Sequence, residues 1–297
     1  MNSIAYPIEK NMSDNYQHTP VMSRESIDFI NIKAGGAYVD CNLGGGGHAE
    51  IIAKTANVIG IDMDQEAVDA AKKRLSAKRN IEYVRDNFKN LKNIVKEPVD
   101  GILFDLGISS YQIDEPSRGF SVKNDGPLDM RMDKSQKLTA EQIINNFEQE
   151  ELEKIFKKYG EERFSKRIAR RIIEIRDMQY VNTTFQLKEL VEKAIPTWKK
   201  RESVTRIFQA LRIAVNDELN SLKTALNDAV DLLKPGGRIV ILSYHSLEDR
   251  IAKQTLRNAK REEKIIILTK KPVRAGEEEI ASNPRAKSAK LRAGERI

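Results

Sequence analysis

The sequence has few cysteine, histidine and tryptophan residues and no long apolar run. Among its 297 residues there is one cysteine, Cys41, so no disulfide can form within the chain. No apolar stretch approaches the roughly 20 residues that span a bilayer, and the N-terminus lacks the basic start and apolar core of a secretory signal. These absences exclude a disulfide-stabilised secreted domain and an integral membrane protein, and they predict a cytoplasmic location.

Residue patterns for metal binding and for covalent hydrolysis are also missing. The three histidines, His18, His48 and His245, and the lone Cys41 have no partner at the spacing of a metal site, so no metal is expected. There is no phosphate-binding loop with its lysine and no nucleophile elbow. Cys41 is expected to be a small buried residue at a strand end rather than a nucleophile.

Positive charge is concentrated near the C-terminus. The chain has 51 Lys and Arg against 44 Asp and Glu, a formal net charge of +7. Residues 251–297 contain 13 basic and 6 acidic residues, so this segment holds the whole excess. A neutral body with a basic tail indicates a polyanionic partner, although a solubilising tail has the same composition.

Apolar, β-branched runs alternate with helical patterns in the first third of the chain. Four short strands are expected at residues 37–41, 57–61, 81–84 and 99–104. Helical spacing of apolar residues separates them, as in Gln65–Leu75. Strands joined by helical segments of about ten residues predict a doubly wound α/β fold with a parallel sheet.

The alternation stops near residue 111. A loop rich in Gly, Pro and Asp and then helical patterns such as Glu162–Arg176 follow. We interpret residues 111–203 as a helical insertion that forms a substrate domain, within a discontinuous domain formed by residues 18–110 and 204–297. Residues 1–17 are expected to be a flexible N-terminal segment.

The last part of the chain is expected to start with one long helix, Val204–Leu233, that ends at a Lys-Pro-Gly-Gly stretch. A buried strand at 238–243, a helix at 247–261 and a strand at 264–269 should follow. The remainder is interpreted as a basic tail.

A glycine-rich turn follows the first expected strand. Residues 39–49 read Val-Asp-Cys-Asn-Leu-Gly-Gly-Gly-Gly-His-Ala, and such a turn lets the backbone approach a ligand at a helix N-terminus. Gly44, Gly46 and Ala49 also fit the dinucleotide pattern G-x-G-x-x-A, so the glycines alone do not separate a nicotinamide cofactor from S-adenosylmethionine. His48, at the helix N-terminus, is expected to be neutral.

Carboxylates follow the next strands. Asp62 closes the second strand 18 residues after Gly44, where a carboxylate can accept both ribose hydroxyls of an adenosine; Asp64 is the better N-cap of the next helix. Phe88, after the third strand, fits either an adenine contact or a core position. Asp105 follows the fourth strand and should face the crevice at the strand ends, near the reacting centre.

Nine stretches resemble the MraW (RsmH) family of small-subunit ribosomal RNA cytosine-N4 methyltransferases. In chain order they are His18-Thr19-Pro20-Val21, Gly46-Gly47-His48, Asp105-Leu106-Gly107-Ile108-Ser109-Ser110, Arg118-Gly119-Phe120-Ser121, Asp125–Met132, Tyr159–Phe164, Thr205–Ile213, Ser243–Arg250 and Asn283–Ala286. Two departures occur: Asn42-Leu43-Gly44 stands where the family usually has Thr-x-Gly, and Tyr244 stands where it usually has Phe.

The resemblance implies a Rossmann-like class I methyltransferase fold with S-adenosylmethionine as cofactor. It implies 16S rRNA in the 30S subunit as substrate and methylation of the exocyclic N4 of one cytidine. Whether naked RNA or the assembled subunit is read, and whether a homodimer forms, stays open. The cofactor contacts that it implies are Gly46, Gly47, His48, Asp62, Phe88, Asp105 and Gln112.

Asp105 is the candidate catalytic residue, because a carboxylate that accepts an N4–H bond would hold the amine and stabilise its developing charge. Phe120 and Tyr111 are candidates for stacking on the base. Basic side chains that could hold RNA phosphates, or could be plain surface charges, are Arg163, Arg167, Arg206, Arg285, Lys287 and Arg292.

Three other interpretations fit parts of the pattern. A nicotinamide-dependent dehydrogenase shares the glycine turn, but no convincing acid or base for hydride transfer is found. A non-catalytic RNA-binding assembly factor that retains a cofactor pocket is the second. A DNA cytosine-N4 methyltransferase is the third, although Asp105 is not followed by the usual Pro-Pro-Tyr.

Overall fold

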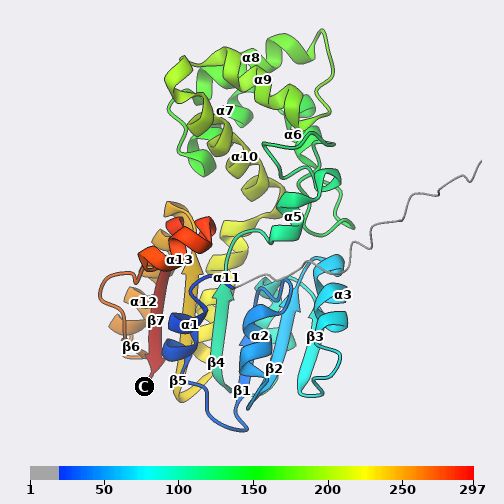
Figure 1. Cartoon of the computed structure of the whole chain (residues 1–297). Coiled ribbons are helices and arrows are strands. Elements are labelled where there is room, and N and C mark those ends of the chain that lie inside the picture. The colour runs from blue at the N-terminus through cyan, green and yellow to red at the C-terminus, as the bar shows by residue number, and fades with distance from the viewer. Residues whose placement is uncertain (1–19) are drawn as a thin grey trace, which may run out of the picture.

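Seven strands form one sheet in the order β3-β2-β1-β4-β5-β7-β6 (Figure 1). A computed structural model describes residues 20–297, so the expected flexible segment 1–17 and His18 lie outside the described residues. The first five strands in this order pair in parallel, whereas β7 is antiparallel to β5 and β6. The strands are β1 (Ala37–Asp40), β2 (Asn57–Asp62), β3 (Ile81–Arg85), β4 (Val99–Asp105), β5 (Leu233–Ser243), β6 (Ile265–Ile267) and β7 (Lys290–Arg296).

Helices cover both faces of this sheet. Alternate strand residues point to opposite faces, so Ile102 enters one hydrophobic cluster and Leu103 another. The first cluster contains residues of α4 (Leu91–Ile94), α11 (Glu218–Leu232) and α12 (Ser246–Arg261), and the second those of α1 (Ser23–Ile30), α2 (Gly47–Ile52) and α3 (Gln65–Arg74). The predicted doubly wound α/β class is therefore confirmed.

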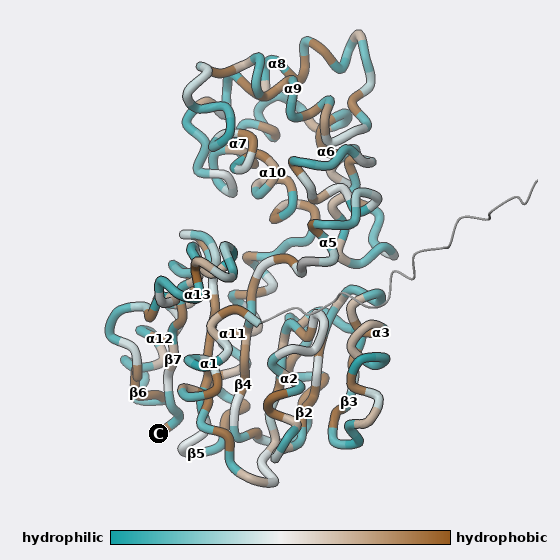
Figure 2. Tube along the Cα trace, viewed as in Figure 1, coloured by the Kyte–Doolittle hydropathy of each residue, from teal (hydrophilic) through white to brown (hydrophobic). Residues whose placement is uncertain are grey.

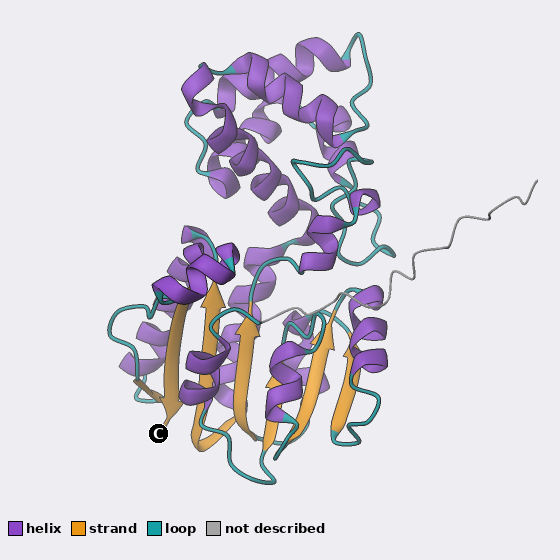
Figure 3. Cartoon of the chain, viewed as in Figure 1, coloured by secondary structure: helices purple, strands orange, loops and turns teal. Residues whose placement is uncertain are grey.

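A second, helical part follows β4 (Figure 3). It contains α5 (Ser110–Asp114), α6 (Ala140–Asn146), α7 (Gln149–Gly160), α8 (Ser165–Arg176), α9 (Thr184–Ala194) and α10 (Lys200–Asn216). Apolar and polar residues alternate along these helices (Figure 2), and the apolar ones form a separate core around Phe156, Ile168, Leu187 and Ile207. Capping boxes at Thr139 and Thr183 begin α6 and α9. Short 3-10 turns occur at η1 (Phe88–Asn90), η2 (Pro116–Arg118), η3 (Thr197–Lys199) and η4 (Pro284–Ser288).

The prediction of a single long helix at Val204–Leu233 is wrong. Asp217 adopts a left-handed conformation with φ of 48° and separates α10 from α11. The buried Asn216 side chain fixes this break: it donates to the Met130 carbonyl at 2.8 Å and accepts from the Met132 amide at 2.8 Å. Apolar residues of α10 pack in the helical core, so that core extends past the expected boundary at residue 203.

The expected basic tail is also folded. It contains α13 (Glu277–Ser282), η4 and β7, and β7 lies between β5 and β6. Arg292 in β7 is 7% exposed and binds the Asp249 carboxylate at 2.6 Å. Its suggested role in binding RNA phosphate is therefore wrong, because the side chain already has a buried partner. No helix within residues 20–297 has the length and apolar character needed to cross a bilayer.

Candidate active site

A cavity of about 280 Å³ lies at the carboxyl ends of the central strands. The strand order reverses between β1 and β4, and ligands of open α/β sheets bind at such a point. Residues of both the sheet and the helical part line the cavity. Among them are these residues that the sequence singled out: Cys41, Gly44, Gly47, His48, Asp62, Phe88, Asp105, Gln112 and Arg285.

The glycine turn forms one wall of the cavity. Gly44 has a φ of 49° and Gly46 a φ of 76°, conformations that side chains disfavour. Gly46 does not line the cavity; a Cβ there would lie 2.7 Å from Cδ1 of Leu75, the C-cap residue of α3, and 3.5 Å from Ala71 Cβ within that helix. Close packing against α3 thus requires this glycine, and its contact with the cofactor stays a prediction.

Asp62 lies at the end of β2 with both carboxylate oxygens hydrogen-bonded to the backbone. The Gly44 and Asp64 amides each donate at 2.9 Å. Burial raises the pKa of Asp62 to about 6, although these two bonds lower it. Each oxygen retains a lone pair for a ligand hydroxyl. Asp64 caps α3 by accepting from the Glu66 amide, as expected.

Phe88 combines the two roles that the sequence left open. Its ring packs edge-on against Phe104 with centroids 5.9 Å apart, and it also lines the cavity. The core contact with Phe104 holds the ring in place, and the surface left in the cavity can contact a planar ligand.

Asp105 lies at the end of β4 and lines the cavity. The Tyr244 hydroxyl donates to Asp105 Oδ1 at 2.7 Å, and His48 Nδ1 lies 3.6 Å from Oδ2. Burial raises the pKa of Asp105 to about 7, against the lowering effect of the Tyr244 bond. Burial also lowers the pKa of His48, which agrees with the neutral ring expected from the sequence.

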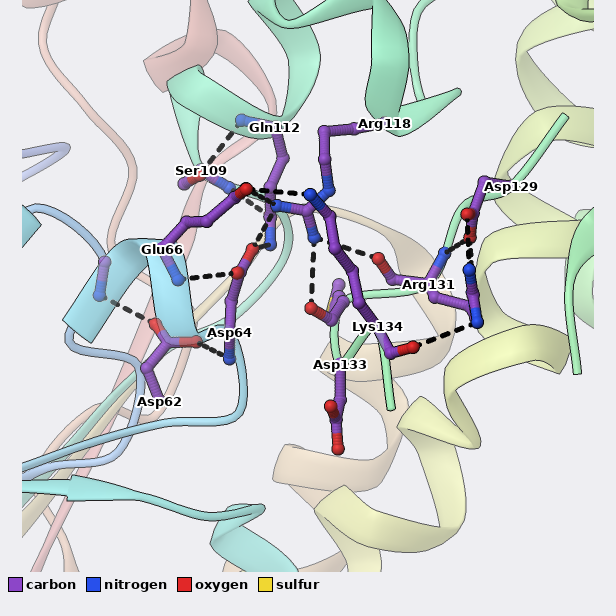
Figure 4. A network of polar contacts seen from close by, with 12 residues as sticks. Asp62, Asp64, Glu66, Ser109, Gln112, Arg118, Asp129, Arg131, Asp133 and Lys134 are labelled. Atoms are coloured by element: carbon purple, nitrogen blue, oxygen red, sulfur yellow. Dashed lines mark hydrogen bonds and ion pairs between the residues drawn. The ribbon is translucent and has the colours of Figure 1, made fainter. Parts of the chain in front are cut away.

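Gln112 and Arg118 join the loop after β4 to the β2–α3 turn (Figure 4). Gln112 Nε2 donates to Asp64 Oδ2 at 2.7 Å. Arg118, 2% exposed, binds the same oxygen at 2.7 Å, pairs with Glu66, and donates to the carbonyls of Arg131 and Met132. Sequence reasoning missed this network, because no spacing indicates that residues about fifty positions apart will meet.

A second group of charges lines the side of the cavity next to α12. Arg212 binds Glu218 through two 2.8 Å bonds. Glu248 accepts from the Tyr244 amide at 2.8 Å and lies 3.1 Å from His245 Nε2. Burial raises the pKa of Glu248, but His245 and Arg212 outweigh it and the net shift is downward. Glu218, His245 and Glu248 are potential metal ligands within 4.8 Å of one another, yet Arg212 already engages both oxygens of Glu218.

The suggested stacking residues do not reach the cavity. Phe120 is 7% exposed and belongs to the core of the helical part, so its suggested role is wrong. Tyr111 on α5 is 37% exposed but does not line the cavity. Cys41 is buried, and burial raises the pKa of its thiol well above its usual range, as expected for a residue that is not a nucleophile.

The remaining basic candidates differ in their surroundings. Arg163, Arg167 and Lys287 are exposed. Arg206 pairs with Glu202 at 2.6 Å. Arg285 differs from these, because it lines the cavity, and it lies 3.8 Å from Asp114 of α5.

Comparisons with known proteins identify the family of the chain. Residues 15–297 match the model of the MraW methylase family. The ribosomal RNA small subunit methyltransferase H of Halothermothrix orenii is 50% identical over 95% of this chain and 99% of its own. That of Carboxydothermus hydrogenoformans is 45% identical over 95% and 98%. An rRNA methylase structure from Streptococcus thermophilus covers 93% of each chain at 13% identity and a TM-score of 0.45, too distant to bear on function. The chain belongs to the MraW methylase family and is a methyltransferase that uses S-adenosylmethionine.

Proposed function

We propose that this methyltransferase methylates the exocyclic N4 of one cytidine in the 16S rRNA of the small ribosomal subunit. The names of the relatives support the RNA substrate, and the resemblance of the sequence motifs supports the N4 position. The observation that carries the proposal is Asp105: a half-buried carboxylate placed in the same cavity as the glycine turn, Asp62 and Phe88. The small subunit is a cytoplasmic particle, so we place the reaction in the cytoplasm.

The cavity offers the groups that S-adenosylmethionine needs. Asp62 can accept the ribose hydroxyls, Phe88 can contact the adenine, and the glycine turn lets the backbone approach. Two buried atoms, Asn42 Oδ1 and His48 Nε2, have no hydrogen-bond partner among residues 20–297 and are available to a ligand. When bound, the cofactor supplies an electrophilic methyl carbon on a sulfonium. The proposed contacts are those of the resemblance: Gly46, Gly47, His48, Asp62, Phe88, Asp105 and Gln112.

Asp105 supplies the chemistry that a cytosine amine requires. The N4 lone pair is delocalised into the ring, so the amine must be held in line with the methyl carbon. The bound cofactor would supply the methyl group for the new bond to N4, with the electrons of the carbon–sulfur bond remaining on its sulfur, and Asp105 would accept the one proton that N4 must lose. The pKa of Asp105, about 7, suits a proton acceptor near neutral pH.

Access to N4 requires that the base leaves its stack and enters the cavity. Arg285 lines the cavity, where it can neutralise a phosphate of the extruded nucleotide. The exposed Arg163, Arg167 and Lys287 are proposed contacts to flanking phosphates. The helical part is therefore the proposed substrate domain.

The Asp105→Asn variant tests this role. Asparagine keeps an oxygen that can accept from Tyr244 but cannot take a proton, so methyl transfer to small subunits should fall by about 10² or more. Binding of S-adenosylhomocysteine, measured by calorimetry, should change only a few-fold. Turnover near the wild-type value with normal binding would show that Asp105 is not the acceptor.

A further inference from the structure

The Tyr244 side chain is held in one position within the cavity wall. Its amide donates to Glu248 Oε2 at 2.8 Å, and its hydroxyl donates to Asp105 Oδ1 at 2.7 Å. Its ring covers Gly107, where an added Cβ would lie 3.3 Å from Tyr244 Cδ2. Gly107 has a φ of 102°, which favours glycine. These contacts direct the hydroxyl at one oxygen of Asp105.

The two oxygens of Asp105 are therefore not equivalent. Oδ1 is bonded to Tyr244, whereas Oδ2 lies 3.6 Å from His48 Nδ1, which is beyond a good hydrogen bond. We propose that Tyr244 is a positioning residue: its hydroxyl orients the Asp105 carboxylate with Oδ2 toward the target amine and favours the charged form that accepts the proton. This inference rests on the proposed function of Asp105.

The other groups around Asp105 do not supply this stabilisation. The charge of Glu248 raises the pKa of Asp105, as burial does, and the Tyr244 bond opposes both. His48 cannot replace the hydroxyl as a cation, since burial lowers the pKa of its ring. Tyr244 itself stays a donor, because burial raises the pKa of its hydroxyl well above the usual range. The charged or titratable groups that face Asp105 or Tyr244 from the surrounding elements are Asp40, His48, Glu248 and Glu279. Arg212 lies behind them, 3.9 Å from Glu248.

A hydroxyl with this role sets the pH at which the reaction runs, but the reaction can proceed without it. Removing the bond should raise the pKa of Asp105, because hydrogen bonds to the charged form of a carboxylate favour that form. The variant should then need a higher pH for the same rate, while its rate at high pH should approach that of the wild type. A residue with a purely structural role would instead lower the rate equally at every pH.

The test compares Tyr244→Phe with Tyr83→Phe, which removes a buried hydroxyl that has no hydrogen-bond partner among residues 20–297. Methyl transfer to small subunits is measured from pH 6 to 9. For Tyr244→Phe we expect the acid limb to move up by about one pH unit, which lowers the rate at pH 7 about five-fold and leaves it nearly unchanged at pH 9. Tyr83→Phe should follow the wild-type profile, and both variants should bind S-adenosylhomocysteine within about two-fold of wild type.

A second measurement is independent of activity. The ¹³C shift of the Asp105 carboxyl, assigned by its loss in Asp105→Asn, should titrate at higher pH in Tyr244→Phe than in the wild type. An unchanged titration, or a rate loss that is uniform across pH, would overturn the inference. Wild-type turnover in Asp105→Asn together with a shifted carboxyl titration would instead overturn the proposed role of Asp105 as the proton acceptor and leave the coupling of Tyr244 to Asp105 intact.

Discussion

Three aspartates at the carboxyl ends of the strands lower the stability of the folded chain at neutral pH. Burial raises the pKa of Asp40 and Asp62 to about 6 and that of Asp105 to about 7. In the unfolded chain these groups lose their protons near pH 4. The folded chain therefore binds more protons between about pH 4 and 7, and their contribution to stability declines as the pH rises through this window.

This reasoning predicts that Asp105→Asn stabilises the protein even as it abolishes activity. At pH 8 the ligand-free variant should unfold with a free energy about 1–3 kcal/mol higher than wild type, and the difference should vanish near pH 4. Urea unfolding at both pH values measures it, with the exposed Asp69→Asn as a control. A difference that does not depend on pH would show that Asp105 has the same pKa in the folded and the unfolded chain.

At the scale of helices and strands, elements with a local sequence pattern were predicted, whereas elements fixed by contacts with distant residues were not. The first four strands follow apolar runs, and α3 begins at Asp64 as its capping pattern predicts. In contrast, β7 has few large apolar residues and is fixed by pairing with β5 and β6. The break at Asp217 depends on the bonds of Asn216 to Met130 and Met132, which no pattern within the helix indicates.

Of the candidate site, the residues at the strand ends could be predicted from the sequence, but their partners could not. Residues that follow strands, such as Asp62 and Asp105, could be placed because parallel strands end at one edge of a sheet. The partners of Asp105 and Asp64 could not, because Tyr244 and Arg118 reach them from segments far along the chain. The comparisons with known proteins, and not the glycine turn, exclude the dehydrogenase interpretation.

A substitution of Arg118 tests whether contacts between distant segments stabilise the fold. Arg118 is buried and joins Asp64 and Glu66 to the loop carbonyls of Arg131 and Met132. Arg118→Met leaves the buried Asp64 without its cation, so the free energy of unfolding should fall by about 3 kcal/mol. The exposed pair of Arg170 with Glu174 is the control: Arg170→Met should change it by less than about 1 kcal/mol. Equal losses in urea unfolding would contradict the role of Arg118.

At the scale of the whole molecule, the two parts meet on both sides of the cavity. Arg118 binds Asp64 beside β2, and Glu161 at the end of α7 accepts from Ser246 and Arg250 of α12 beside β5. Contacts on both sides hold the mouth of the cavity in place. Under the proposed function, we expect the cavity to accept RNA whose shape exposes the target nucleotide.

The most direct test of the central claim is to identify the methylated nucleoside. The protein is combined with labelled S-adenosylmethionine and with either small subunits or naked 16S rRNA. The RNA comes from a strain that lacks the protein and is digested to nucleosides after the reaction. The account predicts label in N4-methylcytidine, at one site per RNA. Label in a different nucleoside, or none with either substrate although S-adenosylhomocysteine still binds, would contradict it.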